Sequence, residues 1–422
     1  MRIAKAILVD PDRNLVYGLG AITISMFVFA YSTLFGKVPI LVYYAVWFPL
    51  LLVDYRRVLG NWLRYWWIVP FAVLALLSVF WSQATGTSAR AAVQFATHLL
   101  CAVIAARTIS VRTLALGTIV GIIIVVLYSL AFGSYHYDPF DGDFSFSGAF
   151  ASKNLLGFFC SIGIYFAVAA IFVLHERPIW CVLAALCIGL AGYALIAAHS
   201  ATALLTTIIA LAALIGLGVV TPFRPRTRKI LAAFGIVLGI GLIVAAMAGG
   251  GFDFILGLFG KNSTLTGRTY LWSQGLAAAT NAPMLGVGYQ AYWVQGFPDA
   301  ERLWEEFYIT TKTGFHFHNT YIETLVELGV VGTVLLTIVL VGTTIGYLRR
   351  FLGNREDKGA RILLGLMLML LLRSFVEVDV INPYAVGSFL LFYSAVLLAA
   401  SRSHESAGQA DQYVVRWVAD PR

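Results

Sequence analysis

Charged residues are scarce in this sequence: Asp, Glu, Lys and Arg make up 12% of the 422 residues, whereas 60% are hydrophobic. Soluble domains average about one charged residue in four, so this composition excludes a water-soluble fold. In a soluble protein, the net charge of +8 would suggest nucleic acid. In so apolar a chain, the basic residues instead mark the loops that stay in the cytoplasm, and no nucleic-acid partner is expected.

Cysteines are also few, and the sequence offers no cleavage signal. All four cysteines lie inside apolar runs, which indicates small buried side chains and not disulfides or metal ligands. The first apolar stretch, Leu15 to Phe35, is followed by Lys37 and not by a small-residue cleavage site. We therefore expect a membrane-spanning helix there and no removable signal peptide.

Long apolar runs fill most of the chain. A helix that crosses the hydrocarbon core needs about 20 mostly apolar residues. Twelve runs of this order occur, at roughly 15–35, 38–54, 65–81, 91–106, 113–132, 154–174, 179–198, 201–221, 230–248, 320–347, 362–378 and 384–400. The predicted fold class is an all-α polytopic membrane helical bundle with about twelve transmembrane helices.

Loops with many basic residues alternate along the chain with loops that have few. With the N-terminus inside, 21 of the 29 Lys and Arg residues fall in cytoplasmic segments and 8 in outer segments. Basic loops stay in the cytoplasm during insertion, so both termini are predicted to be cytoplasmic. The predicted parts are nine spans in 1–248, a large outer loop domain over 249–319, three spans in 320–400 and a cytoplasmic tail over 401–422.

Two outer segments are long, 133–153 and 249–319. The second has about 70 residues, and a loop of that length is generally functional or disordered. Its aromatic residues argue against disorder. The stretch from Gly267 to Thr280, which ends before Asn281-Ala282-Pro283, predicts a helix, and 303–307 predicts a second short one. We expect a helical cap over the membrane part.

A histidine pair stands at the outer mouth of the tenth span, where His316 and His318 precede Asn319. A histidine with its ordinary pKa of about 6.5 suits proton abstraction, and the asparagine could orient the ring or bind a hydroxyl. The alternative is an interfacial histidine among aromatic anchors. The pair lacks a cysteine or a suitably spaced acid, so no metal and no other cofactor is expected.

Basic residues on the outer side are exceptions to the rule that basic loops stay in the cytoplasm. Arg268 stands at a helix start, where its guanidinium and the free N–H groups favour phosphate oxygens; an exposed loop arginine is the alternative. Lys153 and Asn154 stand at the mouth of the sixth span, with snorkelling as the alternative for the lysine. Arg373 and Glu377 predict an i,i+4 ion pair near the end of the eleventh span.

Two weaker features also lie outside. His199-Ser200 ends the seventh span and fits helix capping or a place in the site. Asp138, Asp141 and Asp143 predict a solvated acidic loop. Together, the outer-side residues predict one basic pocket beside a histidine, suited to an anionic lipid headgroup with a reacting hydroxyl nearby.

An ordered set of motifs resembles the O-antigen ligase and exopolysaccharide polymerase superfamily of bacterial inner-membrane proteins. The motifs are Trp81-Ser82, 148–157, Ser200–Leu205, Leu265–Thr269 with Trp272, Pro283–Tyr289 and His316–Gly329. They extend over about 80–400, with the large loop between the ninth and tenth spans. The resemblance implies a GT-C-like membrane fold in the inner membrane, with the active site on the periplasmic side.

The resemblance also implies an activity and residue roles. A glycan would pass from undecaprenyl pyrophosphate to an acceptor sugar hydroxyl without a metal, with inversion at the anomeric carbon. His318 would activate the hydroxyl, and Arg268, with Lys153 and Asn154, would bind the pyrophosphate. Arg373 is a further candidate on the donor side. The candidates for acceptor binding or support are His316, Asn319, His199, Ser200 and Glu377.

Three functions are consistent with these features. The Lys-Asn-Leu-Leu-Gly and Leu-Thr-Gly-Arg-Thr segments resemble the polymerases, and Ser200-Ala201 departs from the Ser-Arg of many ligases. A polymerase is therefore favoured over a ligase that attaches the glycan to lipid A-core or a protein. A lipid-linked glycan transporter is disfavoured because transporters bind near the midplane, whereas these ionisable residues gather at the outer ends. The expected partners are the lipid-linked glycan, the acceptor glycan or lipid A-core, and membrane lipids.

Overall fold

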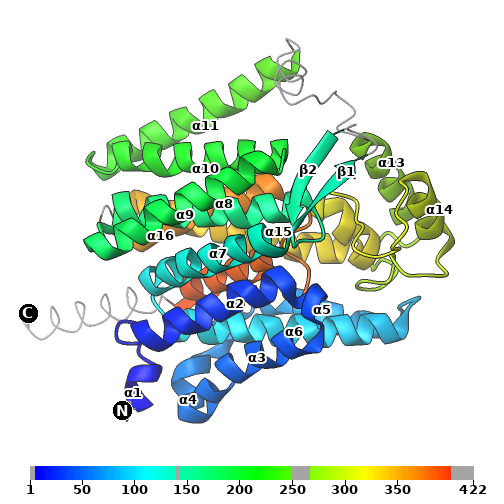
Figure 1. Cartoon of the computed structure of the whole chain (residues 1–422), viewed down its shortest axis with the longest axis horizontal. Helices are drawn as coiled ribbons and strands as arrows, with labels where there is room; N and C mark the ends of the chain where they lie inside the picture. Colours follow the sequence, from blue (N-terminus) through cyan, green and yellow to red (C-terminus); the bar gives the residue numbers. More distant parts are fainter. Residues whose placement is uncertain (1–4, 139–142, 249–266, 355, 401–422) are drawn as a thin grey trace, which may run out of the picture.

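The computed structural model describes residues 5–138, 143–248, 267–354 and 356–400. Over these ranges the chain is mainly helical. Long helices lie side by side in one bundle, and a smaller group of elements covers one end of it (Figure 1). The prediction of an all-α polytopic bundle is confirmed. The predicted tail, 401–422, and the first part of the large loop, 249–266, lie outside the described residues.

The helices follow one another through mostly short connections. In chain order they are α1 (Lys5–Leu8), α2 (Leu15–Phe35), α3 (Lys37–Trp47), α4 (Pro49–Leu59), α5 (Val69–Leu77), α6 (Thr85–Thr108), α7 (Val111–Phe132), α8 (Lys153–Ala169), α9 (Pro178–Ala197), α10 (Ala201–Val220), α11 (Pro225–Ala248), α13 (Arg268–Ala279), α14 (Pro298–Glu306), α15 (Thr320–Gly353) and α16 (Lys358–Arg373). A π-helical turn, Ala170–Leu174, extends α8, and a last apolar helix covers Val386–Ala400.

Each of the twelve predicted apolar runs overlaps a helix. Seven of the described helices are long and apolar enough to cross a membrane, or eight if α3 and α4, which meet at 54°, form one bent span. Pro49 begins α4 at this bend, and proline has no N–H for the preceding turn. The count of twelve stays a prediction.

The helix α8 is the centre of the bundle. In its most apolar stretch 83% of the residues are buried, against 28% in α9 and in α10. The helices α7, α9 and α10 pack around α8. Large apolar side chains of the outer helices remain exposed, such as Ile196 of α9 and Ile215 of α10, as a lipid-facing surface requires. The first turn of α8 is therefore held by the most enclosed helix.

The first long outer segment forms a hairpin. Strands β1 (Ser134–Asp138) and β2 (Asp143–Gly148) pair antiparallel, with Asp138 opposite Asp143. The solvated acidic loop predicted from Asp138, Asp141 and Asp143 stays a prediction, and Asp141 lies outside the described residues. Gly148 has a φ of 61°, and a Cβ added there would lie 2.6 Å from Ser129 Oγ, so the chain passes close to α7 at this point.

The two helices predicted in the large loop are present. α13 follows Gly267 and ends before the Asn281-Ala282-Pro283 stop, as predicted. α14 begins earlier than predicted, because Pro298 suits the first helical position and Asp299 favours the first turn. Both helices share a small hydrophobic core with Phe317 and the first turns of α15. In Figure 1 this cap lies at the opposite end of the bundle from α1.

The helix α15 is interrupted at Gly329, which has a φ of 65° and a ψ of −167°. The segment 283–288 fills the break: Gly288 N–H donates to Glu327 O at 2.9 Å, and Val330 N–H donates to Pro283 O at 2.8 Å. A Cβ added at Gly286 or at Gly329 would overlap the backbone of the opposite segment. The interlocked backbones fix the first turns of α15, and with them the histidine loop, relative to the bundle.

Candidate active site

A buried carboxylate joins the candidates that lie far apart in the sequence. Glu377 Oε1 accepts from Arg268 Nη2 at 2.8 Å and from Asn154 Nδ2 at 2.9 Å. Glu377 Oε2 lies 3.3 Å from His318 Nδ1. Ser200 Oγ donates to Asn154 Oδ1 at 2.8 Å. We call these five residues the Glu377 cluster.

Four helices begin at the Glu377 cluster. Asn154 lies in the first turn of α8, Ser200 caps α10, Arg268 is the first residue of α13, and His318 directly precedes Asn319, the cap of α15. The free N–H groups at a helix N-terminus carry partial positive charge. Four such ends gathered around one cluster favour an anion such as a pyrophosphate.

Arg268 is held on two sides. Its Nη1 donates to Val376 O at 2.7 Å, while Nη2 reaches the neighbouring Glu377. Gly267 precedes it with a φ of 82°, a backbone conformation that glycine adopts without strain. A guanidinium has five N–H donors, so three remain beyond these two bonds. The side chain of Arg268 is 14% exposed, which leaves it within reach of a ligand.

The backbone around His318 is held in an unusual conformation. His318 has a φ of 51°, in the left-handed region that few residues other than glycine adopt. Two contacts hold the preceding residue: Phe317 N–H donates to Glu323 Oε2 at 2.8 Å, and Trp272 Nε1 donates to Phe317 O at 2.9 Å. Strain of this kind, when the surroundings impose it, is common at functional sites.

His316 and Asn319 support this loop. His316 Nδ1 accepts the backbone N–H of His318 at 3.0 Å, and the two rings lie 4.2 Å apart. Asn319 Oδ1 caps α15 through the N–H groups of Tyr321 and Ile322, and its Nδ2 donates to Phe375 O at 3.0 Å. Asn319 thus fixes the start of the helix and ties it to the segment that carries the cluster's carboxylate.

The charges in the cluster are well defined. Burial opposes ionisation of Glu377, but the Arg268 guanidinium and then the His318 ring outweigh it and hold the pKa of the carboxyl well below its usual range. Burial, followed by the nearby His318, lowers the pKa of His316 to about 3. The cluster therefore combines an ionised Glu377, a cationic Arg268 and a neutral His316 at neutral pH.

Arg373 lies deeper than predicted. Its Nε donates to Asp379 Oδ2 at 2.6 Å, its guanidinium lies 4.0 Å from the centre of the Phe158 ring, and the side chain is 1% exposed. The predicted i,i+4 ion pair with Glu377 is wrong: the Glu377 N–H donates to Arg373 O at 2.7 Å, but the Arg373 side chain pairs with Asp379 and that of Glu377 pairs with Arg268. In this position Arg373 stabilises the loop that carries Glu377, and its role on the donor side stays a prediction.

Lys153 and His199 are each adjacent in sequence to a residue of the Glu377 cluster. Lys153 is the half-buried first residue of α8, next to Asn154. His199 is exposed, has a φ of 47° and precedes Ser200. The capping predicted for Ser200 is confirmed, since its Oγ accepts the N–H of Ala203 at 3.3 Å. The same hydroxyl also donates to Asn154 within the cluster, and the functional role of Ser200 stays a prediction.

Three side chains in the cluster also have the spacing of a metal site. One ligand atom from each of His316, His318 and Glu377 lies within 4.8 Å of the others. However, the Arg268 guanidinium already neutralises the carboxylate, and His316 Nδ1 accepts a backbone N–H. A divalent cation would have to compete with a fixed positive charge 2.8 Å from the same carboxylate. The donor set therefore suits an ion-paired base better than a metal, and metal independence stays a prediction.

Sequence reasoning missed the central role of Glu377. The sequence predicts Glu377 as the partner of Arg373 and as a candidate for acceptor binding or support, but not as the partner of Arg268 and Asn154, which are 109 and 223 positions away. Glu323, which fixes the histidine loop, was not singled out at all. The signal that could have identified Glu323 is its residue type, because a carboxyl in the first turn of an apolar helix needs a partner.

Two comparisons with known proteins place the chain in a family. A family described as O-antigen ligase matches residues 183–337, which include Ser200, Arg268 and His318. Exopolysaccharide production protein ExoQ of Rhizobium meliloti (strain 1021) is 53% identical over 407 residues, or 96% of this chain and 94% of that relative. The chain belongs to the O-antigen ligase and exopolysaccharide polymerase family. Its apolar helices and this family make it a multi-pass membrane protein of polysaccharide assembly.

Membership in this family gives the Glu377 cluster a context. The family implies lipid-linked glycans as substrates and a polymerase or ligase function. The matched span contains the arginine and the histidine but ends before Glu377. The assignment of this carboxylate therefore rests on the geometry of the cluster.

Replacement of Glu377 by glutamine is expected to destabilise the protein by about 3–5 kcal/mol, because Arg268 would lose its buried counter-charge. A carboxyl whose pKa falls on folding stabilises the protein above its unfolded pKa of about 4.3, and this stabilisation is lost only as the pH falls through the lower, folded pKa. The difference in thermal midpoint between wild type and Glu377→Gln should therefore stay constant from about pH 8 to about pH 5.

The measurement is thermal unfolding in detergent across this pH range. Glu305→Gln, which changes an exposed acid on the cap, is the matched control and should leave the midpoint unchanged. A difference that disappears between neutral and mildly acidic pH would show that Glu377 takes up a proton there. That result would contradict the charges assigned to the cluster.

Proposed function

We propose that this protein is a glycosyltransferase that moves a glycan from undecaprenyl pyrophosphate onto an acceptor sugar hydroxyl at the periplasmic face of the inner membrane. The observation that carries the proposal is the Glu377 cluster, in which a carboxylate holds an imidazole and a guanidinium side by side. The expected topology, with both termini in the cytoplasm, supports the periplasmic placement. In Figure 1 the cap, which carries Arg268, lies at the opposite end from the N-terminus.

His318 is the proposed general base. When Nδ1–H of His318 donates to Glu377, the lone pair of the ring lies on Nε2 at the opposite side. Its side chain is 23% exposed, whereas that of Glu377 is 5% exposed, so the ring can meet a substrate. The acceptor hydroxyl gives its proton to Nε2 while its oxygen attacks the anomeric carbon. The resulting imidazolium is stabilised by the carboxylate behind it.

Arg268 and the helix N-termini are the proposed site of the leaving group. As the new glycosidic bond forms, the bond from the anomeric carbon to the pyrophosphate oxygen breaks, and the electron pair leaves with the lipid pyrophosphate. The remaining N–H donors of Arg268, with Lys153 at the start of α8, would neutralise the growing charge. Attack in line with the leaving group inverts the anomeric centre, and no metal is required.

A polymerase is the favoured function, and the acceptor is then another lipid-linked repeat unit. The relative that is 53% identical is named an exopolysaccharide production protein, which favours exopolysaccharide as the product. The second candidate is a ligase for lipid A-core or a protein, favoured by the description of the matched family. Both functions use the same donor and the same base, so they differ only in the acceptor.

Replacement of His318 by alanine should lower the transfer rate by about a hundredfold or more, the usual contribution of a general base. The assay is the formation of lengthened glycan by purified protein in liposomes that contain lipid-linked repeat units. His136→Ala removes an exposed histidine from β1 and should retain full activity. If His318→Ala transfers glycan at the wild-type rate, the base is another group.

Replacement of Arg268 by alanine should chiefly raise the donor concentration needed for half-maximal rate, because a pyrophosphate contact is lost. The change also leaves Glu377 unpaired, so the double variant Arg268→Ala/Glu377→Gln is needed to remove that charge. The double variant should regain thermal stability but not donor affinity. Arg302→Ala, on the exposed face of α14, is the control. Unchanged donor affinity in both Arg268 variants would contradict the pyrophosphate contact.

Deletion of the gene distinguishes the two acceptors. A missing polymerase should leave single repeat units on the carrier lipid, and a missing ligase should leave polymer of normal length there. Chain-length profiling of the lipid-linked glycans measures this difference. Accumulated full-length polymer would contradict the polymerase function while leaving the transferase chemistry in place.

A further inference from the structure

A second polar site lies at the far end of the bundle from the Glu377 cluster. Helices α10 and α15 begin at the cluster and end at a pocket of about 310 Å³. The 20 residues of α10 span about 30 Å, which is the thickness of a bilayer core. In Figure 1 the turn between α10 and α11 lies at the opposite end from α13.

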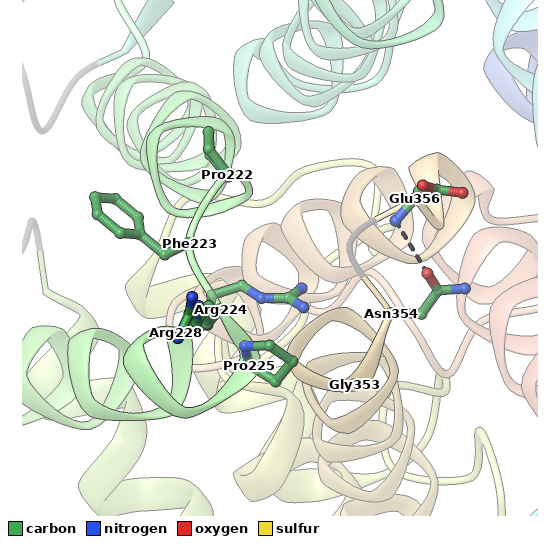
Figure 2. A pocket seen from close by; sticks show the side chains of 8 residues that line it. All are labelled: Pro222, Phe223, Arg224, Pro225, Arg228, Gly353, Asn354 and Glu356. Atoms are coloured by element: carbon green, nitrogen blue, oxygen red, sulfur yellow. Dashed lines mark hydrogen bonds between the residues drawn. The ribbon is translucent and has the colours of Figure 1, made fainter.

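The pocket is formed by two segments, as Figure 2 shows. Phe223, Arg224 and Arg228 come from the turn and first residues of α11, and Asn354 and Glu356 follow the end of α15. The lining therefore contains two arginines and one glutamate. The backbone N–H of Glu356 donates to Asn354 Oδ1 at 3.0 Å, which fixes that side of the pocket.

Arg228 is the unusual residue of the pocket, because it is a buried cation with an unused donor. Its side chain is 1% exposed, and Nη1 donates to Phe351 O at 2.6 Å. Its Nε is buried and makes no hydrogen bond to any described residue. A buried cation without a counter-charge is costly, and an anion in the pocket would supply that counter-charge.

The surroundings of the pocket indicate an amphiphilic anion. Phe223, at its rim, is 46% exposed. The following helix, α11, leaves large apolar side chains exposed, among them Ile230 at 61%, Phe234 at 63% and Val237 at 69%. Free phosphate would satisfy only the arginines, whereas a phospholipid would place its phosphate in the pocket and its acyl chains along α11.

We propose that this pocket binds the phosphate of an anionic phospholipid, in the leaflet opposite the Glu377 cluster. Basic pockets between transmembrane helices bind such headgroups. The lipid would join the start of α11 to the end of α15. This inference depends on the position of the pocket and not on the transferase proposal.

The test compares two exposed arginines of the same segment in the full-length protein. Arg224 lines the pocket, and Arg226, two residues on, does not. Phosphatidylglycerol retention is measured by native mass spectrometry and by the rise in thermal midpoint on lipid addition. Arg224→Ala should weaken binding roughly fivefold or more, and Arg226→Ala should not. Arg228 is unsuitable as the main variant because it also holds Phe351 O.

Each further measurement either supports or contradicts the site. Phosphatidylcholine has no net charge, so the wild-type protein should retain it no better than the Arg224→Ala variant does. Inorganic phosphate at millimolar concentration should raise the thermal midpoint little. Equal losses in the Arg224 and Arg226 variants would show general surface attraction and overturn the proposal. A full stabilisation by inorganic phosphate alone would identify a free-phosphate site and overturn the lipid.

Discussion

The architecture of the site depends on one buried carboxylate and the charges that neutralise it. Glu377 is 5% exposed, and an ionised carboxylate at that depth is stable only when it is paired and hydrogen-bonded. Arg268 supplies the charge, and Asn154 and His318 complete the bonding. Because these partners come from different helices, satisfying one anion brings the cap, α8 and the histidine loop to a single point.

The helices meet at this point through breaks in regular structure. Gly329 and Gly286 allow two backbones to interlock in the middle of α15, and Gly267 turns the chain into α13. His318 itself has a left-handed φ. Four helix N-termini consequently face one cluster, an arrangement that no single amphipathic pattern produces. The strain is compensated by bonds such as that from the Phe317 N–H to Glu323.

Residue type and membrane side were enough to single out His318 and Arg268 as candidates, because a base and a cation at the outer boundary are conspicuous in so apolar a chain, and both lie in the Glu377 cluster. Their roles, which come from the family resemblance, stay predictions. The pairing was not predictable. The i,i+4 rule assigned Glu377 to Arg373, and the backbone keeps that spacing, since the Glu377 N–H donates to Arg373 O. The two side chains nevertheless have other partners, Asp379 for Arg373 and Arg268 for Glu377. Helical spacing brings two residues close together, but it does not fix their side-chain partners when a distant segment supplies a competing charge.

The proposed chemistry places a negative carboxylate close to a negative pyrophosphate, and the two would repel each other. The cluster reduces this repulsion because Arg268 and His318 share the neutralisation of Glu377. In the resting state Arg268 neutralises Glu377, and His318 is a weaker partner at 3.3 Å. As the acceptor proton moves to His318, the new imidazolium becomes the counter-charge of Glu377. Arg268 is then free to compensate the charge that develops on the leaving pyrophosphate. The positive charge of Arg268 thus becomes available to the leaving pyrophosphate in the same step in which negative charge develops on it. No charged side chain has to move in from solvent.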